Sequence, residues 1–274
     1  MNNLSKVWSE LYRRYHEIGM ELLGGYSPFL VQNSRSAPFN YIHQNGVLKS
    51  TSGGIANDEA SFLYSICELI KPKRILVIGN SYGFSTVFLS LANPKAKLVA
   101  FDKYRTKGLE VTSSLVKDLK DKHVVKGSTP EDIPNLIDTY LDGQVDLVLV
   151  DAVHTNEMQS AEWPLYLPYL SESAVVCFHD VISCGLIPSF ESLKSANKDK
   201  FVFRLVPKTS SGMGLAIRTN VFDKHQNFFD YFCQSLDRVF SFGSYCSRNF
   251  NASATELADQ IDIMELSKPP HPQL

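Results

Sequence analysis

Between residues 74 and 218, short apolar runs rich in β-branched residues alternate with segments of helical periodicity. This alternation limits the fold more than any other feature of the chain. The predicted strands are 74–78, 97–101, 123–125, 145–150, 174–178, 201–206 and 213–218, and the predicted helices between them are 85–91, 108–120, 131–141, 156–170 and 187–196. Such a pattern builds an α/β fold: a doubly wound, mainly parallel seven-stranded sheet, ending in a hairpin with an antiparallel final strand.

Both flanks of this region are expected to be largely helical. Residues 1–24 carry apolar residues at helical spacing, whereas residues 26–56 are rich in Ser, Asn, Gly and Pro and predict a loop. A helix is predicted from Asn57 to Ile70, with Asn57 as its N-cap. We divide the chain into 1–56, an N-terminal helix and loop (a candidate lid or dimer contact), 57–218, the sheet domain, and 219–274, an aromatic-rich helical extension.

The charge balance argues against a protein that grips nucleic acid. The 274 residues include 27 Lys and Arg against 29 Asp and Glu, a net charge of −2, so a broad basic surface for phosphates is not expected. The sequence has no run of about 20 apolar residues and no signal-peptide pattern. Five cysteines without C-x-x-C spacing predict reduced thiols and a cytoplasmic protein.

A glycine-containing turn follows the first strand of the alternating region. Gly79 and Gly83 flank Asn-Ser-Tyr where a strand leads into a helix, and such turns bind ligands at the carboxyl edge of parallel sheets. Their backbone amides favour negatively charged groups. The spacing is G-x-x-x-G rather than the dinucleotide pattern G-x-G-x-x-G. The turn is therefore either a ligand site or a tight turn with glycines for steric reasons.

Asp102 ends the second strand, about 20 residues after the glycine turn. An acidic residue at this place accepts hydrogen bonds from the hydroxyls of a ribose in many nucleotide-binding sheets. The alternative is a helix cap or a solvated loop carboxylate. The placement favours a nucleoside-binding role.

Acidic and imidazole side chains follow two further strands. Asp151 ends the strand 145–150 with His154 three residues later, and His179-Asp180 ends the strand 174–178. Because neighbouring parallel strands present their carboxyl ends at one edge, these groups are expected to converge beside the glycine turn. Carboxylates and imidazoles suit a divalent cation, and a histidine can act as general base near neutral pH. A structural histidine is the alternative at either position.

In order and spacing, these motifs resemble class I S-adenosylmethionine-dependent methyltransferases. The likeness is greatest to metal-assisted small-molecule O-methyltransferases of the catechol and antibiotic-tailoring types, over residues 57–218. The resemblance implies a Rossmann-like fold, S-adenosylmethionine as cofactor, and methyl transfer to a hydroxyl group of a small molecule. It implies these cofactor-binding residues: Gly79, Asn80, Ser81, Tyr82, Gly83, Ser85, Asp102, Ser128, Thr129 and Asp151.

The resemblance also implies individual roles. The glycine turn and Ser85 would surround the methionine part, Asp102 would hold the ribose, and Ser128 with Thr129 would lie beside the adenine. The positions of metal ligands correspond to Asp151, His179 and Asp180, with magnesium as the expected ion, and His154 and Asp151 would be the catalytic residues.

Three positions depart from the family pattern. Val77 stands where an acidic residue usually orients the amino group of the cofactor, which puts cofactor affinity in question. His179 replaces an aspartate ligand, and His154 replaces a lysine general base. An imidazole is chemically suited to that role, because its ordinary pKa already lies near neutrality.

Other functions use similar sheets. A nicotinamide-dependent oxidoreductase is disfavoured because the dinucleotide glycine pattern is absent. A binding protein that has lost activity is favoured by Val77 and opposed by the acidic and histidine positions, whereas a metal-dependent hydroxylase or hydrolase would use the same two histidines. For the methyltransferase, the expected partners are a small-molecule acceptor and a second copy of the chain, with neither nucleic acid nor membrane.

Overall fold

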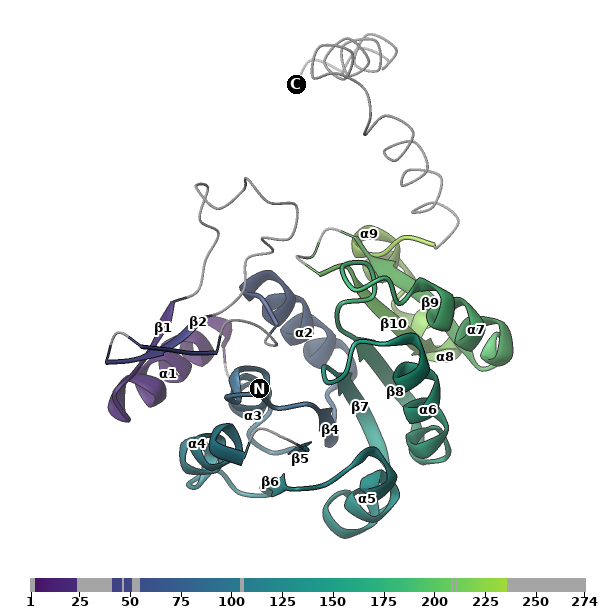
Figure 1. The fold of residues 1–274 in the computed structure, drawn as a ribbon. Coiled ribbons are helices and arrows are strands. Elements are labelled where there is room, and N and C mark those ends of the chain that lie inside the picture. Colours follow the sequence, from purple (N-terminus) through teal and green to yellow (C-terminus); the bar gives the residue numbers. More distant parts are fainter. Residues whose placement is uncertain are drawn as a thin grey trace, which may run out of the picture. The chain divides into compact units, whose positions relative to one another are not determined.

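Seven strands form one sheet in the order β6-β5-β4-β7-β8-β10-β9 (Figure 1). The computed structural model describes residues 3–23, 41–45, 47–50, 55–103, 106–207, 209 and 211–235. The strands of this sheet are β4 (Arg74–Ile78), β5 (Lys97–Asp102), β6 (Lys122–Lys126), β7 (Val145–Val150), β8 (Leu170–Phe178), β9 (Phe201–Val206) and β10 (Met213–Arg218). All seven predicted strands are present, and β8 begins four residues before its predicted start at Ala174.

The strand order reverses between β4 and β7. From β4 the chain moves outward to β5 and β6, then returns to β7 on the other side of β4. The pairs β4–β5, β5–β6, β4–β7 and β7–β8 are parallel, whereas β10 runs antiparallel to both β8 and β9. The α/β class, the mainly parallel sheet and the antiparallel final strand are confirmed. A ligand site is expected outside the strand ends at the reversal.

Helices cover both faces of the sheet. Packing contacts link α1, α2, α3 and α4 with one another in a layer on one face, and link α5, α6 and α7 on the other. The helices are α1 (Leu4–Glu17), α2 (Asn57–Ile70), α3 (Phe84–Ala92), α4 (Thr106–Val116), α5 (Ile133–Leu141), α6 (Asn156–Tyr166), α7 (Ile187–Asn197), α8 (Thr219–Lys224) and α9 (Gln226–Phe232), with 3₁₀ turns η1 (Pro130–Asp132) and η2 (Leu167–Tyr169). In the part of the chain that the structure describes, no helix is long and apolar enough to cross a bilayer.

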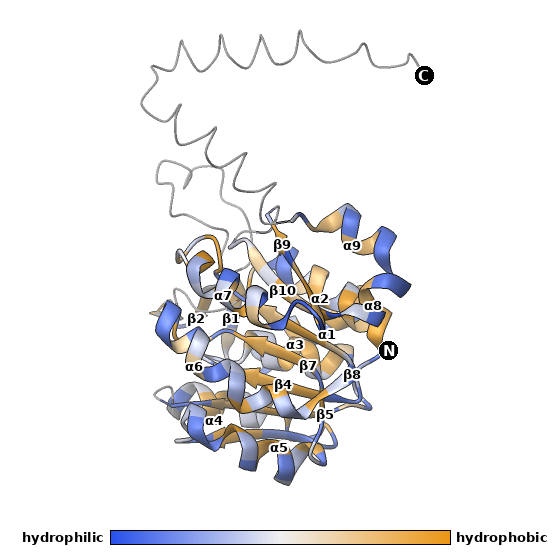
Figure 2. Cartoon of the chain, turned by 90° about the vertical axis from the view of Figure 1, so that its right-hand side faces the viewer, coloured by the Kyte–Doolittle hydropathy of each residue, from blue (hydrophilic) through white to orange (hydrophobic). Residues whose placement is uncertain are grey.

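The central strands are mostly apolar because helices shield both of their faces. Every residue of β7 is buried, and the hydrophobic strands lie between helices whose outer surfaces are hydrophilic (Figure 2). This packing holds the carboxyl ends of β4, β7 and β8 in a fixed register. Ile78 pairs with Val150, and Val150 pairs with Phe178.

The N-terminal region differs from its prediction. The helix predicted over 1–24 ends at Glu17, Gly19 turns the chain at φ +71°, and β1 (Met20–Leu23) follows. Within the predicted loop 26–56, β2 (Tyr41–Gln44) and β3 (Val47–Ser50) form a small antiparallel sheet with β1. The loop prediction is therefore wrong for these residues, because the strands gain cross-strand hydrogen bonds that local composition does not report.

Helix α1 is an integral part of this fold. Trp8 packs against Phe84 and Phe88 of α3, at ring-centroid distances of 6.2 and 4.8 Å. The hydroxyl of fully buried Tyr15 donates a hydrogen bond of 2.7 Å to the carbonyl of Tyr82 in the glycine turn. Met1–Cys233 form one compact unit. The division after residues 56 and 218 stays a prediction, and most of 219–274 lies outside the described residues.

A buried acid on α6 predicts a pH-dependent stability. Glu162 is 2% exposed, and burial, with a smaller contribution from Glu131, raises its pKa to about 7. Because the folded chain holds this proton more tightly than the unfolded chain, stability is lost as pH rises from about 4.5 through 7. We expect Glu162→Gln to be about 3 kcal/mol more stable than the native chain at pH 8, and nearly equal at pH 4.5.

Urea unfolding at several pH values measures this difference. Glu157→Gln, on the exposed face of the same helix, is the matched control and should change little at any pH. A stability difference for Glu162→Gln that does not vary with pH would contradict the assignment.

Candidate active site

The glycine turn after β4 is required by close packing. Gly79 has φ +91°, and a Cβ there would lie 1.9 Å from the carbonyl oxygen of Asp151. Gly83 has φ +86°, and a Cβ there would lie 2.1 Å from Oγ1 of Thr112 on α4. The turn is thus wedged between the end of β7 and helix α4. The steric role of both glycines is established, and their contact with a cofactor stays a prediction.

Asp102 organises the same turn. Its Oδ2 accepts hydrogen bonds from the backbone amides of Asn80 and Ser81, at 3.2 and 3.0 Å. This contact brings the carboxylate from the end of β5 to the edge where the sheet order reverses. The predicted ribose contact of Asp102 is untested, but the carboxylate lies in the place that this role requires.

The Asn80 side chain is directed into the protein and is 3% exposed. Its amide donates to Thr112 Oγ1 and to the Ser81 carbonyl, both at 2.9 Å, and its Oδ1 accepts from Thr86 Oγ1 at 2.9 Å. The side chain therefore holds the turn against α3 and α4. Any contact of Asn80 with a cofactor has to come from its backbone.

The predicted adenine-binding residues lie where β6 leads into α5. Ser128 is 8% exposed. The amide of Thr129 donates a hydrogen bond of 2.8 Å to Asp132 Oδ2, and this bond caps the turn η1. Ser85 lies in the first turn of α3 and is 3% exposed. These positions border the same strand ends as the glycine turn, and their ligand contacts stay predictions.

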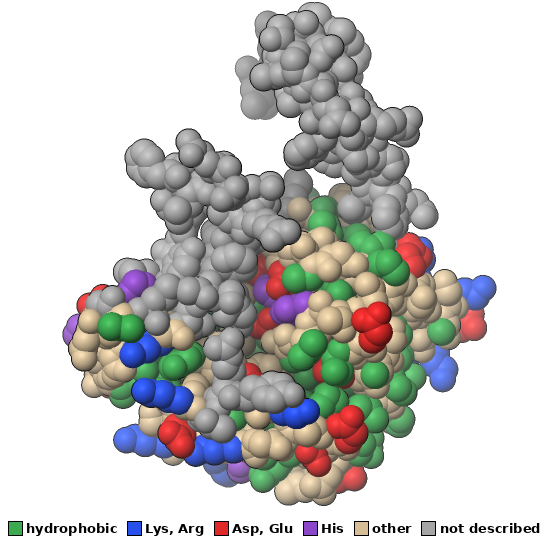
Figure 3. Space-filling view, viewed as in Figure 1, with side chains coloured by type: hydrophobic (Ala, Val, Ile, Leu, Met, Phe, Trp, Pro, Cys, Tyr) green, Lys and Arg blue, Asp and Glu red, His purple; other side chains and the backbone are tan. Residues whose placement is uncertain are grey.

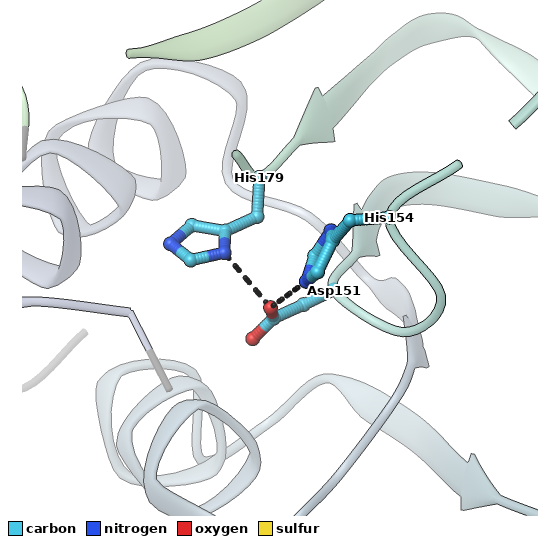
Figure 4. Close-up of side chains that lie close together, drawn as sticks. All are labelled: Asp151, His154 and His179. Atoms are coloured by element: carbon cyan, nitrogen blue, oxygen red, sulfur yellow. Dashed lines mark ion pairs between the residues drawn. The ribbon is translucent and has the colours of Figure 1, made fainter. Parts of the chain in front are cut away.

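The acidic and histidine residues converge as predicted. His179 Nδ1 lies 2.9 Å from Asp151 Oδ1 and 3.2 Å from Asp180 Oδ2. His154 Nε2 lies 3.3 Å from Asp180 Oδ2 and 3.7 Å from Asp151 Oδ1. Figure 4 shows both imidazoles directed at the Asp151 carboxylate. We call Asp151, His154, His179 and Asp180 the acid–histidine cluster.

Backbone geometry places this cluster at the strand ends. The amide of Asp151 donates to the Ile78 carbonyl at 2.8 Å, and the amide of His179 donates to the Val150 carbonyl at 2.9 Å. The chain then turns sharply at Asp180, which has φ +57°. The side chain of His154 is 21% exposed, against 1% for His179. Figure 3 shows histidine and acidic side chains together on one face of the molecule.

Glu59 is a member of this site that the sequence analysis missed. It lies in the first turn of α2, is 0% exposed, and its Oε2 is 3.0 Å from His179 Nε2. The N-cap of α2 is Ala56 rather than the predicted Asn57, and its amide donates to Glu59 Oε2 at 2.9 Å. Because Ala56 has no side-chain oxygen, the segment lacks the Ser/Thr-x-x-Glu capping signature. No local pattern therefore marks Glu59 or its contact with a residue 120 positions later.

Burial and neighbouring charges shift the pKa values of the residues in this site. Burial raises the pKa of Asp151, and the imidazole of His179 offsets only part of that rise. For Asp180, burial also acts upward, but the neighbouring imidazole of His179 and a hydrogen bond from Ser183 prevail and lower the pKa to about 2. Burial lowers the pKa of His179, yet the surrounding carboxylates raise it well above its ordinary value. The three carboxylates around His179 therefore favour a positive charge among them.

Residues 76–181 match a family model described as a methyltransferase domain. This stretch of the chain is similar to methyltransferase domains. The match extends from β4 to the residue after Asp180, and so includes the glycine turn and the whole acid–histidine cluster.

A catechol O-methyltransferase of Mycobacterium tuberculosis is 29% identical over 135 residues, which are 48% of this chain and 58% of that protein. The chain therefore spans little more than half the length of this relative. This match and the domain match confirm the resemblance to class I S-adenosylmethionine-dependent O-methyltransferases.

Solved methyltransferase structures share the fold. A provisionally assigned O-methyltransferase from Klebsiella pneumoniae has a TM-score of 0.52 and 16% identity, over 77% of this chain and 89% of that one. An O-methyltransferase from Bacillus cereus, in complex with SAH, has a TM-score of 0.50 and 18% identity, over 61% and 84%. A SAH-bound methyltransferase from Podospora anserina has a TM-score of 0.50 and 17% identity, over 61% and 80%. At these identities, the structures establish the Rossmann-like fold alone.

The acid–histidine cluster fits a cation. Within the described part of the chain, Asp151 Oδ1 and His179 Nδ1 are among the buried side-chain atoms that lack a hydrogen-bond partner. The two atoms lie 2.9 Å apart, but the Asp151 oxygen is not in the direction in which Nδ1 of His179 would donate or accept a hydrogen bond. Ligands bound to one ion at about 2.1 Å are themselves roughly 3 to 3.5 Å apart. His179 Nδ1 lies 2.9 and 3.2 Å from the oxygens of Asp151 and Asp180, close to that range.

Proposed function

We propose that this chain transfers a methyl group from S-adenosylmethionine to a hydroxyl group of a small molecule, with a divalent cation at the acid–histidine cluster. The observation that carries the proposal is the position of that cluster. It lies at the carboxyl ends of β7 and β8, directly beside the glycine turn after β4. The match to a methyltransferase domain and the catechol O-methyltransferase relative support it.

The cofactor is proposed to lie along the glycine turn, with its ribose at Asp102 and its adenine near Ser128 and Thr129. When bound, S-adenosylmethionine supplies an electrophilic methyl group on a sulfonium. The turn provides a backbone surface for the cofactor, and its glycines let the chain approach the cofactor closely. Neighbouring structures were solved with SAH, which supports this choice of cofactor.

Asp151, His179 and Asp180 are proposed to hold the cation. A bound divalent cation lowers the pKa of a coordinated hydroxyl group and favours its oxyanion. Asp151 is 6% exposed and Asp180 is 9% exposed, so their carboxylates are shielded from most competing water. The chain contributes a preorganised pair of negative groups next to the cofactor turn.

His154 is proposed as the general base. Its side chain is the most exposed of the cluster, so an acceptor can reach it, and its Nε2 faces Asp180 Oδ2 at 3.3 Å. The carboxylate orients the ring and stabilises the imidazolium that forms when His154 takes the acceptor proton. A small-molecule acceptor, a homodimer and a cytoplasmic location are proposed with this function.

Calorimetry and a transfer assay test the function. The chain is titrated with SAH and S-adenosylmethionine, and SAH formation is then followed with a panel of phenols that includes catechol. Saturable binding and SAH release that depends on the phenol support the proposal. Binding of neither molecule would leave a binding protein or a metal-dependent hydroxylase or hydrolase as the better account.

The His154→Gln variant tests the base. We expect kcat to fall by roughly 10² to 10⁴-fold, while the affinity for SAH stays unchanged, because the substitution removes proton transfer but not the cofactor turn. Rates and calorimetric binding constants measure both effects. His16→Gln, on an exposed position of α1, is the matched control. An unchanged kcat in His154→Gln would remove the histidine from the mechanism.

A further inference from the structure

In the part of the chain that the structure describes, groups of Ala56, Ser211 and His179 face the buried carboxylate of Glu59. Oε2 accepts from the amide of Ala56 at 2.9 Å, and Oε1 accepts from the amide of Ser211 at 3.0 Å. The Ser211 hydroxyl lies between the Asp180 amide, which donates to it at 3.3 Å, and Glu59 Oε1, which it contacts closely. Because it accepts from Asp180, it donates to Glu59. Both oxygens of Glu59 therefore act as acceptors, as expected of an ionised carboxylate.

This network determines which ring nitrogen of His179 carries a proton. The remaining partner of Glu59 is His179 Nε2, at 3.0 Å. A carboxylate that only accepts requires N–H at this nitrogen. Nδ1 is then the atom of His179 that can take or release a further proton or bind an ion. It faces Asp151 and Asp180 at 2.9 and 3.2 Å.

We propose that Glu59 is a positioning residue that keeps the proton of His179 on Nε2, so that Nδ1 serves as a nitrogen ligand. As a consequence, the acid–histidine cluster prefers a first-row transition ion to Mg²⁺. The inference deepens the proposed function and rests on its cation site. A carboxylate that holds the outer nitrogen of a metal-binding histidine fixes the ring orientation and raises its basicity.

The donor set determines the ion class. Mg²⁺ prefers oxygen ligands and retains several of its waters, whereas imidazole nitrogen favours Fe²⁺, Co²⁺, Ni²⁺ and Zn²⁺. Here the imidazole nitrogen Nδ1 of His179 lies 2.9 Å from Asp151 Oδ1 and 3.2 Å from Asp180 Oδ2. At this cluster we therefore expect an ion that accepts mixed nitrogen and oxygen ligands, rather than magnesium.

A second arrangement of the same atoms has to be distinguished. His179 could hold protons on both nitrogens and act as a permanent imidazolium between the carboxylates. Its Nδ1 is without a hydrogen bond of acceptable direction, although two carboxylate oxygens are within 3.2 Å. That geometry favours a bound ion over a second proton at Nδ1. The protonation state of His179 in the metal-loaded protein distinguishes the two arrangements.

Titration of the full chain with CoCl₂ and MgCl₂, in the absence of cofactor and acceptor, measures the preference. We expect Co²⁺ to bind at least about 100-fold more tightly than Mg²⁺, with visible absorption bands that disappear in His179→Asn. Equal affinities, or Co²⁺ bands that persist in His179→Asn, would overturn the inference.

Glu59 is tested with a pair of variants. Glu59→Gln places an NH₂ group toward either His179 or the Ser211 amide, and we expect Co²⁺ affinity to fall 10- to 100-fold. Ser211→Ala removes the hydroxyl that donates to Glu59 and accepts from the Asp180 amide, but it leaves the contact of Glu59 with His179, so Co²⁺ affinity should change less than about threefold. Thermal melts show whether each variant is folded. A similar loss of affinity in both would mean that Glu59 has only a structural role.

Nitrogen-detected NMR of the Zn²⁺-loaded protein provides the direct readout. We expect His179 to keep its proton on Nε2 and to show a ligand-bound Nδ1. Two protonated nitrogens in the loaded protein would overturn the inference. SAH calorimetry and methyl transfer are measured separately. Loss of the metal preference with intact transfer therefore rejects this inference, whereas absence of SAH binding rejects the proposed function.

Discussion

Replacing Asp151 with asparagine is expected to reduce methyl transfer by roughly 10³-fold, with little change in SAH affinity. Asp151 is 6% exposed, and its Oδ1 lies 2.9 Å from His179 Nδ1 and 3.7 Å from His154 Nε2. Asparagine keeps the shape but loses the negative charge that the proposed cation requires. Rates of SAH formation and calorimetric titration with divalent cations measure the two consequences.

Asp146→Asn is the matched control for this variant. Asp146 is also a buried acid on β7, but it lies at the opposite end of the strand, where its carboxylate pairs with Arg74 at 3.2 Å. We expect this change to lower thermal stability and to leave transfer by the folded protein intact. Full activity in Asp151→Asn, or undiminished transfer in excess chelator, would contradict the role of the cation.

The second large effect is expected for Gly79→Ala. A Cβ at this position would lie 1.9 Å from the Asp151 carbonyl oxygen, on a residue with φ +91°. The clash is with backbone, so the ends of β4 and β7 have to separate. We expect a loss of about 4 kcal/mol in the free energy of unfolding, together with loss of SAH binding.

Gly127→Ala separates the cost of the steric clash from the cost of the backbone conformation. Gly127 also has a positive φ, +71°, but a Cβ there would have nothing within 4 Å. We expect this variant to lose about 1 kcal/mol, which is the cost of the backbone conformation alone. Urea unfolding of both variants gives the comparison. Equal losses would show that the close approach of Gly79 to β7 is unimportant.

The central sheet could be predicted because its signal is local. In runs such as Val145–Val150, every residue is buried and all but Asp146 are apolar, which occurs when both faces of a strand are covered. The convergence of Asp151 with His179 also followed, since neighbouring parallel strands end at one edge. The N-terminal sheet could not be predicted in this way. Its strands are short, and they depend on pairing with partners distant in the chain, such as Met20 with Gln44.

The sequence by itself determined the layered α/β fold, the glycine turn and the edge of the sheet at which the acid–histidine cluster lies, because hydrophobic periodicity and the residues that follow each strand are local features of the chain. Only the tertiary structure decided that Tyr15 supports the turn and that Glu59 holds His179. These contacts join residues 67 and 120 positions apart. They depend on how α1 and α2 pack on the sheet, and helix packing against a sheet is set by the shape of the whole core rather than by any local pattern.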